Sequence, residues 1–248
     1  MDTPRDNTRT AIVTGGSRGI GRATALRLAA NGFAVVVGYS SNRAEAEKVA
    51  AEIVERGGAA TVSGGDVSDA SVVAAMFDAA ETSYGGVDVV VHAAGQMKLA
   101  PVADLDLADL DALLSTNVRG TFAVAQQAVR RVRPGGSVVL FSTSVVGLAF
   151  PTYGAYAATK GAVEALTPIL AKELRGRDVT VNTVAPGPTA TDLFLDGKSE
   201  EQVEALAKQP PLERLGTPAD IARTVAFLTS TDGHWVNGQV LRANGGII

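Results

Sequence analysis

Seven short runs of mostly apolar, often β-branched residues recur along the chain, and longer stretches with helical patterning separate most of them. The central runs are continuously apolar rather than alternating, as expected of strands that are buried on both faces. Strands that alternate with helices form a parallel sheet with right-handed crossovers. The sequence therefore predicts an α/β, doubly wound fold in which helices cover both faces of a seven-stranded parallel sheet. The runs are residues 11–14, 34–38, 59–63, 87–92, 137–143, 180–185 and 239–242.

Helical patterning predicts four long helices, over residues 19–31, 43–56, 71–84 and 155–174. The 248 residues contain no proline- or serine-rich linker and no break in composition, so we expect a single domain over residues 1–248. Polar, helical sequence at residues 192–208 interrupts the alternation after the sixth run. This segment is either a lid over a site or a surface insertion.

Composition argues against several kinds of site. The net charge of −4 gives no electrostatic reason to expect nucleic acid or an anionic membrane surface as a partner. The chain has no cysteine, which excludes thiol catalysis, and its two histidines, His92 and His234, argue against a zinc site. No apolar run approaches the ~20 residues that span a bilayer. Residues 1–9 lack the apolar core of a secretory signal, so we expect a cytoplasmic protein without a metal.

Tyr156 and Lys160 lie four residues apart within one expected helix, and Ser144 precedes the tyrosine by twelve residues. Residues four apart share a helix face. A phenol keeps its proton up to pH ~10, and a neighbouring ammonium lowers that pKa toward the range in which tyrosine is a useful general acid or base. A serine hydroxyl nearby could bind the oxygen that gains or loses the proton. The pair alone fits a surface tyrosine beside a solvated charge equally well, so the rest of the chain must decide.

A glycine-rich segment follows the first apolar run and opens the first expected helix. Glycines allow the backbone to approach a pyrophosphate, and the helix N-terminus offers free N–H donors. The spacing is Gly-x-x-x-Gly-x-Gly, and no Gly-Lys-Ser/Thr follows, which disfavours an NTPase phosphate loop. Its position predicts a dinucleotide site in a Rossmann fold. The segment reads Thr14-Gly15-Gly16-Ser17-Arg18-Gly19-Ile20-Gly21.

The end of the second run indicates which dinucleotide is bound. NAD-preferring sites usually place an acidic residue there for the ribose 2′-hydroxyl. This chain has Tyr39, Ser40 and Ser41 instead. Hydroxyls from the serines and positive charge from Arg18, with Arg43 as a second candidate, would suit a 2′-phosphate, although Arg43 also fits the start of a surface helix. We expect NADP(H).

The glycine loop, Ser144, Tyr156 and Lys160 together resemble the short-chain dehydrogenase/reductase family, and the resemblance covers residues 10–246. It implies that Tyr156 is the general acid/base and that Ser144 hydrogen-bonds the reacting oxygen. Lys160 would lower the pKa of the tyrosine and bind the nicotinamide ribose. Asn117 resembles the asparagine that completes this tetrad through a helix distortion and a bound water.

The same resemblance implies a set of cofactor contacts. Asp66 and Val67 look like the pair that holds the adenine, and the segment after the sixth run is similar to the one that binds the nicotinamide carboxamide. The contacts it implies are Gly15, Ser17, Arg18, Gly19, Ile20, Gly21, Tyr39, Ser40, Ser41, Asp66, Val67, Ala94, Gly95, Tyr156, Lys160, Pro186, Gly187, Thr189 and Thr191.

Some positions depart from the family pattern or have competitors. Many relatives read Asn-Asn-Ala-Gly after the fourth run, where this chain has His92-Ala93-Ala94-Gly95; we interpret His92 as a packed strand-end residue. Ser142 competes with Ser144, and periodicity does not separate them; the family pattern favours Ser144, which precedes two apolar residues and a glycine. Tyr153 has no lysine four residues on, so we expect it to line the substrate pocket.

The resemblance implies an NADP(H)-dependent oxidoreductase that transfers hydride between the nicotinamide and a carbonyl or secondary alcohol. Residues 96–99, 145–153 and 188–208 should form the substrate pocket, with 188–208 as its lid. Its apolar side chains suit an aromatic, polyketide-like or 3-oxoacyl carbonyl. Family members commonly form tetramers, so a homotetramer is implied. The alternatives are a non-catalytic NADP(H)-binding sensor or scaffold and a different Rossmann enzyme, such as a methyltransferase.

Overall fold

The computed structural model describes residues 9–248. Of residues 1–9, which lacked the apolar core of a secretory signal, only Arg9 lies within this range. Within residues 9–248, seven strands form one sheet in the order β3-β2-β1-β4-β5-β6-β7, and every pairing is parallel. This confirms the predicted doubly wound fold. The strands are β1 (Thr10–Thr14), β2 (Ala34–Tyr39), β3 (Ala60–Gly64), β4 (Val87–His92), β5 (Val132–Phe141), β6 (Thr180–Pro186) and β7 (Val240–Ala243).

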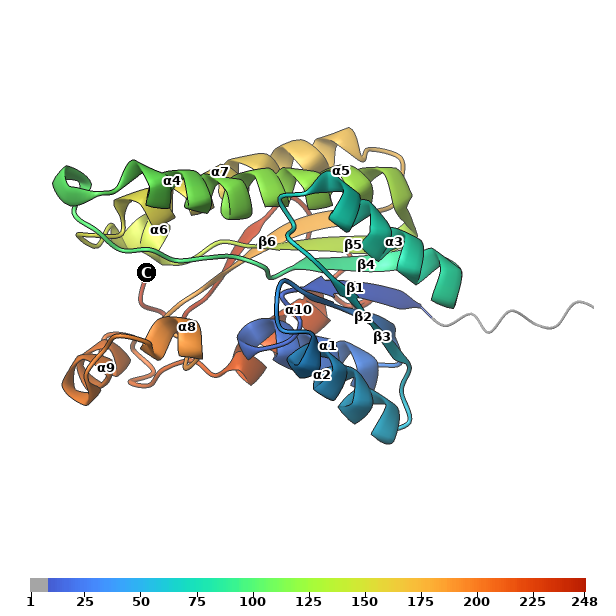
Figure 1. The fold of residues 1–248 in the computed structure, drawn as a ribbon, viewed down its shortest axis with the longest axis horizontal. Helices are drawn as coiled ribbons and strands as arrows, with labels where there is room; N and C mark the ends of the chain where they lie inside the picture. The colour runs from blue at the N-terminus through green and yellow to red at the C-terminus, as the bar shows by residue number, and fades with distance from the viewer. Residues whose placement is uncertain (1–8) are drawn as a thin grey trace, which may run out of the picture.

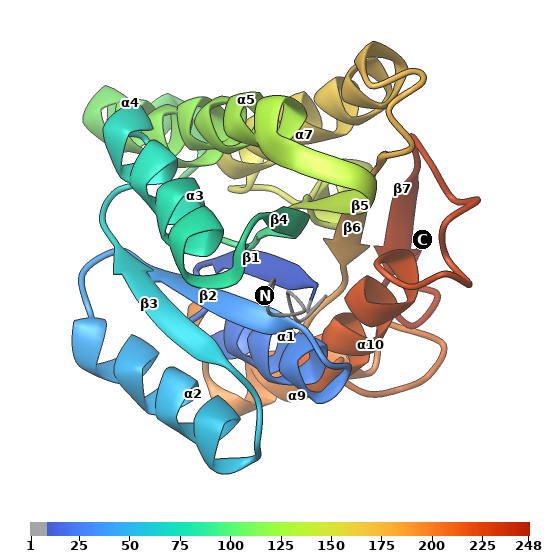
Figure 2. The same cartoon turned by 90° about the vertical axis from the view of Figure 1, so that its right-hand side faces the viewer.

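Helices cover both faces of the sheet (Figures 1 and 2). One layer packs α3 (Ala70–Tyr84), α5 (Gly120–Arg131) and α7 (Gly154–Glu173) against the sheet. The opposite layer contains α1 (Gly19–Ala30), α2 (Arg43–Glu55) and α10 (Pro218–Leu228). None of the helices within residues 9–248 is long and apolar enough to cross a membrane.

The continuous apolar runs follow from this three-layer arrangement. Alternate residues of a strand point to opposite faces. In β1, Ile12 joins the core beneath α3, α5 and α7, whereas Val13 joins the core beneath α1, α2 and α10, and both are fully buried. Phe77 of α3 and Leu28 of α1 are among the largest buried side chains of the two cores. Because both faces are covered, neither face of the central strands needs polar residues.

The structure shifts the fifth strand from its predicted bounds of 137–143. Strand β5 begins at Val132, which pairs with Val87 across a register shift in β4, and it ends at Phe141. Pro134 and the glycines after it hid this early pairing, since proline and glycine are uncommon within strands. Ser142 and Thr143 therefore lie beyond the strand, where the chain turns into the short helix α6 (Val145–Leu148).

A nearly continuous helical stretch between β4 and β5 was not predicted. It consists of η1 (Val102–Asp104), α4 (Leu107–Leu113), the π-helical turn η2 (Leu114–Arg119) and then α5. The Asp106 side chain caps α4 by accepting from the Ala108 N–H at 2.8 Å. Residues 114–121 carry threonine, asparagine, valine and glycine, which are weak helix formers, and these concealed the helix in the sequence.

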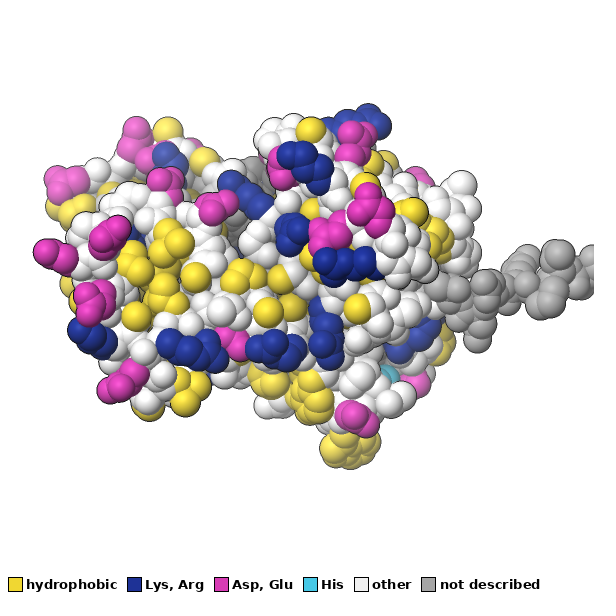
Figure 3. Space-filling model, turned by 90° about the horizontal axis from the view of Figure 1, so that it is seen from below, with side chains coloured by type: hydrophobic (Ala, Val, Ile, Leu, Met, Phe, Trp, Pro, Cys, Tyr) yellow, Lys and Arg dark blue, Asp and Glu magenta, His cyan; other side chains and the backbone are white. Residues whose placement is uncertain are grey.

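The carboxyl ends of all seven strands lie at one edge of the sheet, where the C-terminus and two short helices also gather (Figure 1). These helices are α8 (Asp192–Leu195) and α9 (Glu200–Ala207), which occupy the polar segment that interrupted the strand–helix alternation. Figure 3 views the side of the molecule that carries α1 and α2, and basic and acidic side chains are interspersed over it. There, Arg22 and Arg56 both pair with Glu52.

Candidate active site

A long groove of about 620 Å³ crosses the carboxyl edge of the sheet, where the strand order reverses between β1 and β4. In open α/β sheets, ligands bind at this switch point. The volume falls within the ~300–1,000 Å³ typical of ligand pockets. The predicted dinucleotide contacts that line the long groove are Gly15, Ser17, Arg18, Gly19, Ile20, Gly21, Tyr39, Ser40, Ser41, Asp66, Val67, Ala94, Gly95 and Thr191.

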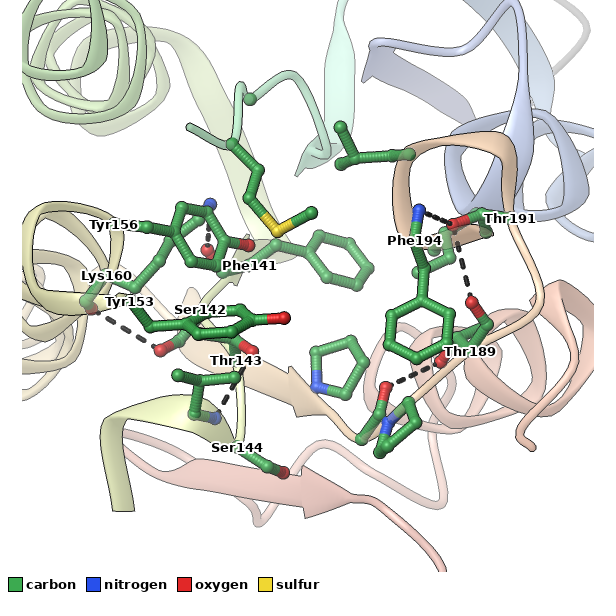
Figure 4. A pocket seen from close by; sticks show the side chains of 18 of the residues that line it. Phe141, Ser142, Thr143, Ser144, Tyr153, Tyr156, Lys160, Thr189, Thr191 and Phe194 are labelled. Atoms are coloured by element: carbon green, nitrogen blue, oxygen red, sulfur yellow. Dashed lines mark hydrogen bonds between the residues drawn. The ribbon is translucent and has the colours of Figure 1, made fainter. Parts of the chain in front are cut away.

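An inner cavity adjoins the long groove, and Ala93, Gly95 and Thr191 line both. Its wall is formed by the end of β5, the start of α7, and the segment after β6 (Figure 4). It contains the remaining predicted contacts, which are Tyr156, Lys160, Pro186, Gly187 and Thr189.

Close approach of backbone segments requires glycine at two positions of the loop. Gly15 has a φ of +64°, and a Cβ there would lie 2.9 Å from the Ala94 nitrogen; a Cβ on Gly21 would lie 2.1 Å from the Gly15 oxygen. Arg18 provides no side-chain cap to α1, and the first turn of the helix carries no acidic residue. The first N–H groups of α1 thus lack a side-chain acceptor within residues 9–248, which fits a phosphate.

One of the two expected cations lines the groove. Arg18 is exposed, lines the groove and forms no salt bridge within the described residues. Arg43 does not line the groove, because its side chain binds Glu47 at 2.7 Å on the surface of α2. Glu45 does line it, paired with Lys48 at 2.6 Å. The structure therefore favours Arg18, and not Arg43, as the charge available to a 2′-phosphate.

Asn117 lies in the π-helical turn η2. This turn is the helix distortion that the family resemblance implied at Asn117. Its side chain is buried, accepts from the Gln96 N–H at 2.8 Å and donates to the Gln96 carbonyl at 2.9 Å. A third bond at 3.1 Å reaches Thr159 of α7. Asn117 thus joins the loop after β4 to the helix that carries Tyr156, at the junction of the groove and the cavity.

Tyr156 and Lys160 are both buried on α7, where the helical spacing brings them together. The Lys160 ammonium lies 5.9 Å from the centre of the tyrosine ring and donates to the Phe141 carbonyl at 2.9 Å. Burial lowers the pKa of Lys160 to about 8. Burial, with a smaller contribution from Tyr153, raises the pKa of Tyr156 to about 12.

These directions correct the expectation that the lysine lowers the pKa of the tyrosine. Removing the phenol from water disfavours the phenolate, and the Lys160 ammonium donates to a backbone carbonyl. Tyr156 therefore holds its proton firmly before any ligand binds.

The three residues after β5 each carry a hydroxyl, and each hydroxyl has different hydrogen-bond partners. Ser142 donates to Glu164 of α7 at 2.7 Å. Ser144 donates to the Ala185 carbonyl at 3.3 Å and accepts from the Asn244 side chain at 3.0 Å. Figure 4 shows the Ser144 side chain directed away from the two tyrosines, which differs from the role that the sequence implied for it. Thr143, between them, was not considered in the sequence and also lines the inner cavity.

His92 is a buried strand-end residue, as interpreted from the sequence. Its Nδ1 lies 2.8 Å from the Thr14 hydroxyl, which also accepts from the Ala94 N–H at 3.2 Å. Burial, followed by the charge of Lys160, lowers the pKa of His92 to about 3, so the ring stays neutral. Thr14 thus joins the end of β4 to the loop that follows it.

Apolar side chains form most of the inner cavity. Tyr153 packs edge-on against Phe150, with ring centres 6.0 Å apart. Phe194 of α8 faces Tyr153 across the cavity (Figure 4). Met97 and Leu206 complete the lining; they lie within the ranges 96–99 and 188–208 that the sequence predicted for the substrate pocket, and Leu206 reaches the cavity from α9. The arrangement can hold an apolar molecule against Tyr156.

Comparisons with known proteins agree with this geometry. Residues 15–248 match the family described as "Enoyl-(Acyl carrier protein) reductase". A short-chain type dehydrogenase/reductase of Picea abies is 47% identical over 96% of this chain and 92% of its own length. An NADPH-dependent aldehyde reductase-like protein, chloroplastic, of Arabidopsis thaliana is 43% identical over 97% of this chain and 94% of its own.

Among solved structures, a short-chain dehydrogenase from Burkholderia cenocepacia in complex with NADP is 34% identical and superposes with a TM-score of 0.91, covering 99% of both chains. The sequence identities, the seven-stranded sheet and the superposition extend over nearly the whole length. This chain belongs to the short-chain dehydrogenase/reductase family.

Proposed function

We propose that this protein is an NADP(H)-dependent oxidoreductase that transfers hydride between the nicotinamide and a carbonyl or secondary alcohol, with Tyr156 as general acid/base. The observation that carries the proposal is that Tyr156 and Lys160 face an apolar cavity that opens into a dinucleotide-sized groove. The chloroplastic relative in Arabidopsis thaliana is named as an NADPH-dependent aldehyde reductase-like protein, which supports the same reaction class.

The long groove fits NADP(H). The N–H groups that open α1 would hold the pyrophosphate, and Arg18, Ser40 and Ser41 would hold a 2′-phosphate. Asp66 and Val67 would contact the adenine. When bound, the cofactor supplies or accepts the hydride.

A residue of the chain itself would transfer the proton. Tyr156 carries its proton at neutral pH, because burial raises its pKa to about 12, and so it can donate to the alkoxide that develops when a carbonyl is reduced. Lys160 would hold the ribose hydroxyls of the nicotinamide and keep a positive charge beside the phenol. In the direction of alcohol oxidation, the phenol must first lose this proton.

The inner cavity selects an apolar carbonyl compound. Phe150, Tyr153 and Phe194 supply aromatic surface, and we propose an aromatic or polyketide-like ketone or aldehyde as substrate, with a 3-oxoacyl compound as the alternative. Residues 188–208 would act as the lid of a single domain, because Leu193 and Leu206 reach the cavity from α8 and α9.

Consumption of NADPH with a panel of carbonyl compounds tests this function. The panel contains aromatic aldehydes, aromatic ketones and a 3-oxoacyl thioester, with an enoyl thioester as the comparison for reduction of a carbon–carbon double bond. We expect turnover with the aromatic carbonyls. Tight NADPH binding without turnover on any carbonyl would instead favour the non-catalytic sensor or scaffold.

We also propose a homotetramer in the cytoplasm. Large apolar side chains are exposed on three elements that could form contacts between subunits: Phe122 on α5, Ile169 on α7 and Phe227 on α10. The Arabidopsis thaliana relative carries "chloroplastic" in its name, so fractionation of the source cells is the test of location.

A further inference from the structure

The segment after β6, which carries predicted nicotinamide contacts, is hydrogen-bonded to the residues that precede α10. The Gly216 N–H donates to the Pro188 carbonyl at 2.8 Å, and the Ala190 N–H donates to the Gly216 carbonyl at 2.9 Å. These two bonds form an isolated parallel bridge between Thr189 and Gly216. Because Pro188 and Thr189 line the inner cavity, the bridge fixes part of the cavity wall.

The bridge also determines where the backbone groups of Thr189 point. The residues before and after Thr189 make the bonds to Gly216, so the N–H and C=O of Thr189 itself point away from that partner. Thr189 is buried, and its N–H has no acceptor among residues 9–248. Within the same residues, its carbonyl accepts from the Thr191 hydroxyl at 3.4 Å. A neighbouring N–H and C=O that are both free to bond match the amide of a carboxamide.

The turn that contains Gly216 is closed by the side chain of Arg214. The Arg214 Nη1 donates to the Leu215 carbonyl at 2.9 Å and to the Asp220 carboxylate at 2.7 Å. The same oxygen of Asp220 accepts from the Thr217 N–H at 2.9 Å. Since Asp220 lies in the first turn of α10, these contacts fasten the residues on both sides of Gly216 to the helix.

The backbone and the charges of this turn indicate that it is constrained. Glu213 has a φ of +49°, in the left-handed region that residues other than glycine adopt rarely and keep only where neighbouring contacts fix them. The hydrogen bonds from Arg214 and from the Thr217 N–H hold the pKa of Asp220 well below its usual range, so the carboxylate stays charged.

We propose that Arg214 and Asp220 are positioning residues that orient the Thr189 backbone toward the nicotinamide carboxamide through the bridge at Gly216. Neither side chain lines the groove or the inner cavity, so the pair acts without touching a ligand. None of the site residues predicted from the sequence lies in this turn. The inference rests on the proposed function, because it concerns how the nicotinamide is held for hydride transfer.

The test compares Arg214→Met with Arg223→Met. Arg223 also pairs with Asp220, through the other carboxylate oxygen, and makes no bond to the turn within the described residues, so it is the matched control. Calorimetry measures the Kd for NADPH and for adenosine 2′,5′-bisphosphate, which has no nicotinamide. Arg214→Met should raise the Kd for NADPH by ~2–10-fold, the worth of one hydrogen bond, and leave the Kd for the bisphosphate unchanged. Arg223→Met should change neither.

Hydrogen exchange tests the bridge in the protein without ligands. The backbone amides of Ala190 and Gly216 should exchange faster in Arg214→Met than in the wild type and at the wild-type rate in Arg223→Met. Gly216→Ala disturbs the bridge directly, because a Cβ there would lie 3.3 Å from the Thr189 hydroxyl oxygen. It should raise the Kd for NADPH and not that for the bisphosphate.

With a carbonyl that the wild type reduces, kcat of Arg214→Met should fall by ~10–10²-fold, because hydride transfer depends on the orientation of the nicotinamide. An equal rise in Kd for both ligands, no rise for NADPH, or the same loss in Arg223→Met would overturn the inference. Binding and exchange need no turnover, so a wild type that reduces no carbonyl would refute the proposed function separately.

Discussion

At the scale of single residues, burial sets the protonation of the site. Tyr156 and Lys160 lie in the same apolar surroundings, which favour the neutral form of both groups and so move their pKa values in opposite directions, up for the phenol and down for the ammonium. The phenol stays protonated at physiological pH, whereas the lysine changes charge close to it.

This predicts the pH dependence of reduction. A lysine with a pKa of about 8 is charged below that pH and neutral above it, so kcat/KM, which reports the free enzyme, should be constant below pH ~8 and fall about tenfold per unit above it. The phenol, with its pKa of about 12, contributes no decline before the lysine does. Values of kcat/KM for NADPH over a pH series, with the carbonyl substrate saturating, check this, and Tyr153→Phe is the control that should keep the same decline. A profile that stays flat to pH ~10 contradicts the account.

We predict that Arg18 contributes most to the preference for NADPH over NADH. Arg18→Ala should raise the Kd for NADPH by about tenfold and leave the Kd for NADH almost unchanged, because an exposed charge-assisted contact to the 2′-phosphate is lost. Fluorescence titration measures both constants. Arg43→Ala is the matched control and should change neither, since Arg43 binds Glu47 outside the groove. Equal affinities of the wild type for NADH and NADPH would refute the preference.

At the scale of elements, the site is built where β4, η2 and α7 meet. Asn117 makes three side-chain hydrogen bonds across this junction. The π-helical turn places its side chain toward the loop after β4, and the Thr14–His92 contact holds the same loop from the opposite side.

Asn117→Ala should therefore lower the stability of the fold as well as the rate of the reaction. It leaves both backbone groups of Gln96 without their partner in a half-buried place, a cost of about 1–3 kcal/mol. For a chain of this size, each kcal/mol lowers Tm by roughly 2–4 °C. Thermal unfolding followed by circular dichroism measures the change. Asp111→Ala, at an exposed position of α4, is the control expected to leave Tm unaltered, and an equal Tm for Asn117→Ala would contradict the role of the junction.

At the scale of the whole molecule, the sequence predicted the sheet because burial on both faces leaves a continuously apolar run in each central strand. It predicted the glycine loop and the Tyr156–Lys160 pair because both depend on local spacing. The direction of the Ser144 hydroxyl was not predictable in this way, since it depends on Asn244, a hundred residues further along the chain. The pKa of Tyr156 was predicted in the wrong direction because spacing shows a neighbouring charge but not the depth of burial.

Assembly is a further property of the whole molecule. Trp235, the chain's one tryptophan, is 99% exposed in the single subunit. A homotetramer of four 25.3 kDa chains would have a mass of about 101 kDa by light scattering. If Trp235 lies at a subunit contact, its emission should shift to shorter wavelength in the assembled protein and return to that of hydrated tryptophan on dilution. A 25.3 kDa particle would contradict the tetramer.

The central claim is that Tyr156 donates the proton in an NADPH-dependent carbonyl reduction. The most direct measurement compares NADPH binding with NADPH turnover in Tyr156→Phe, which removes the hydroxyl oxygen and keeps the ring. The account predicts an unchanged Kd for NADPH and a fall in kcat of ~10²–10⁴-fold. A variant that turns over NADPH at a rate near that of the wild type would contradict it.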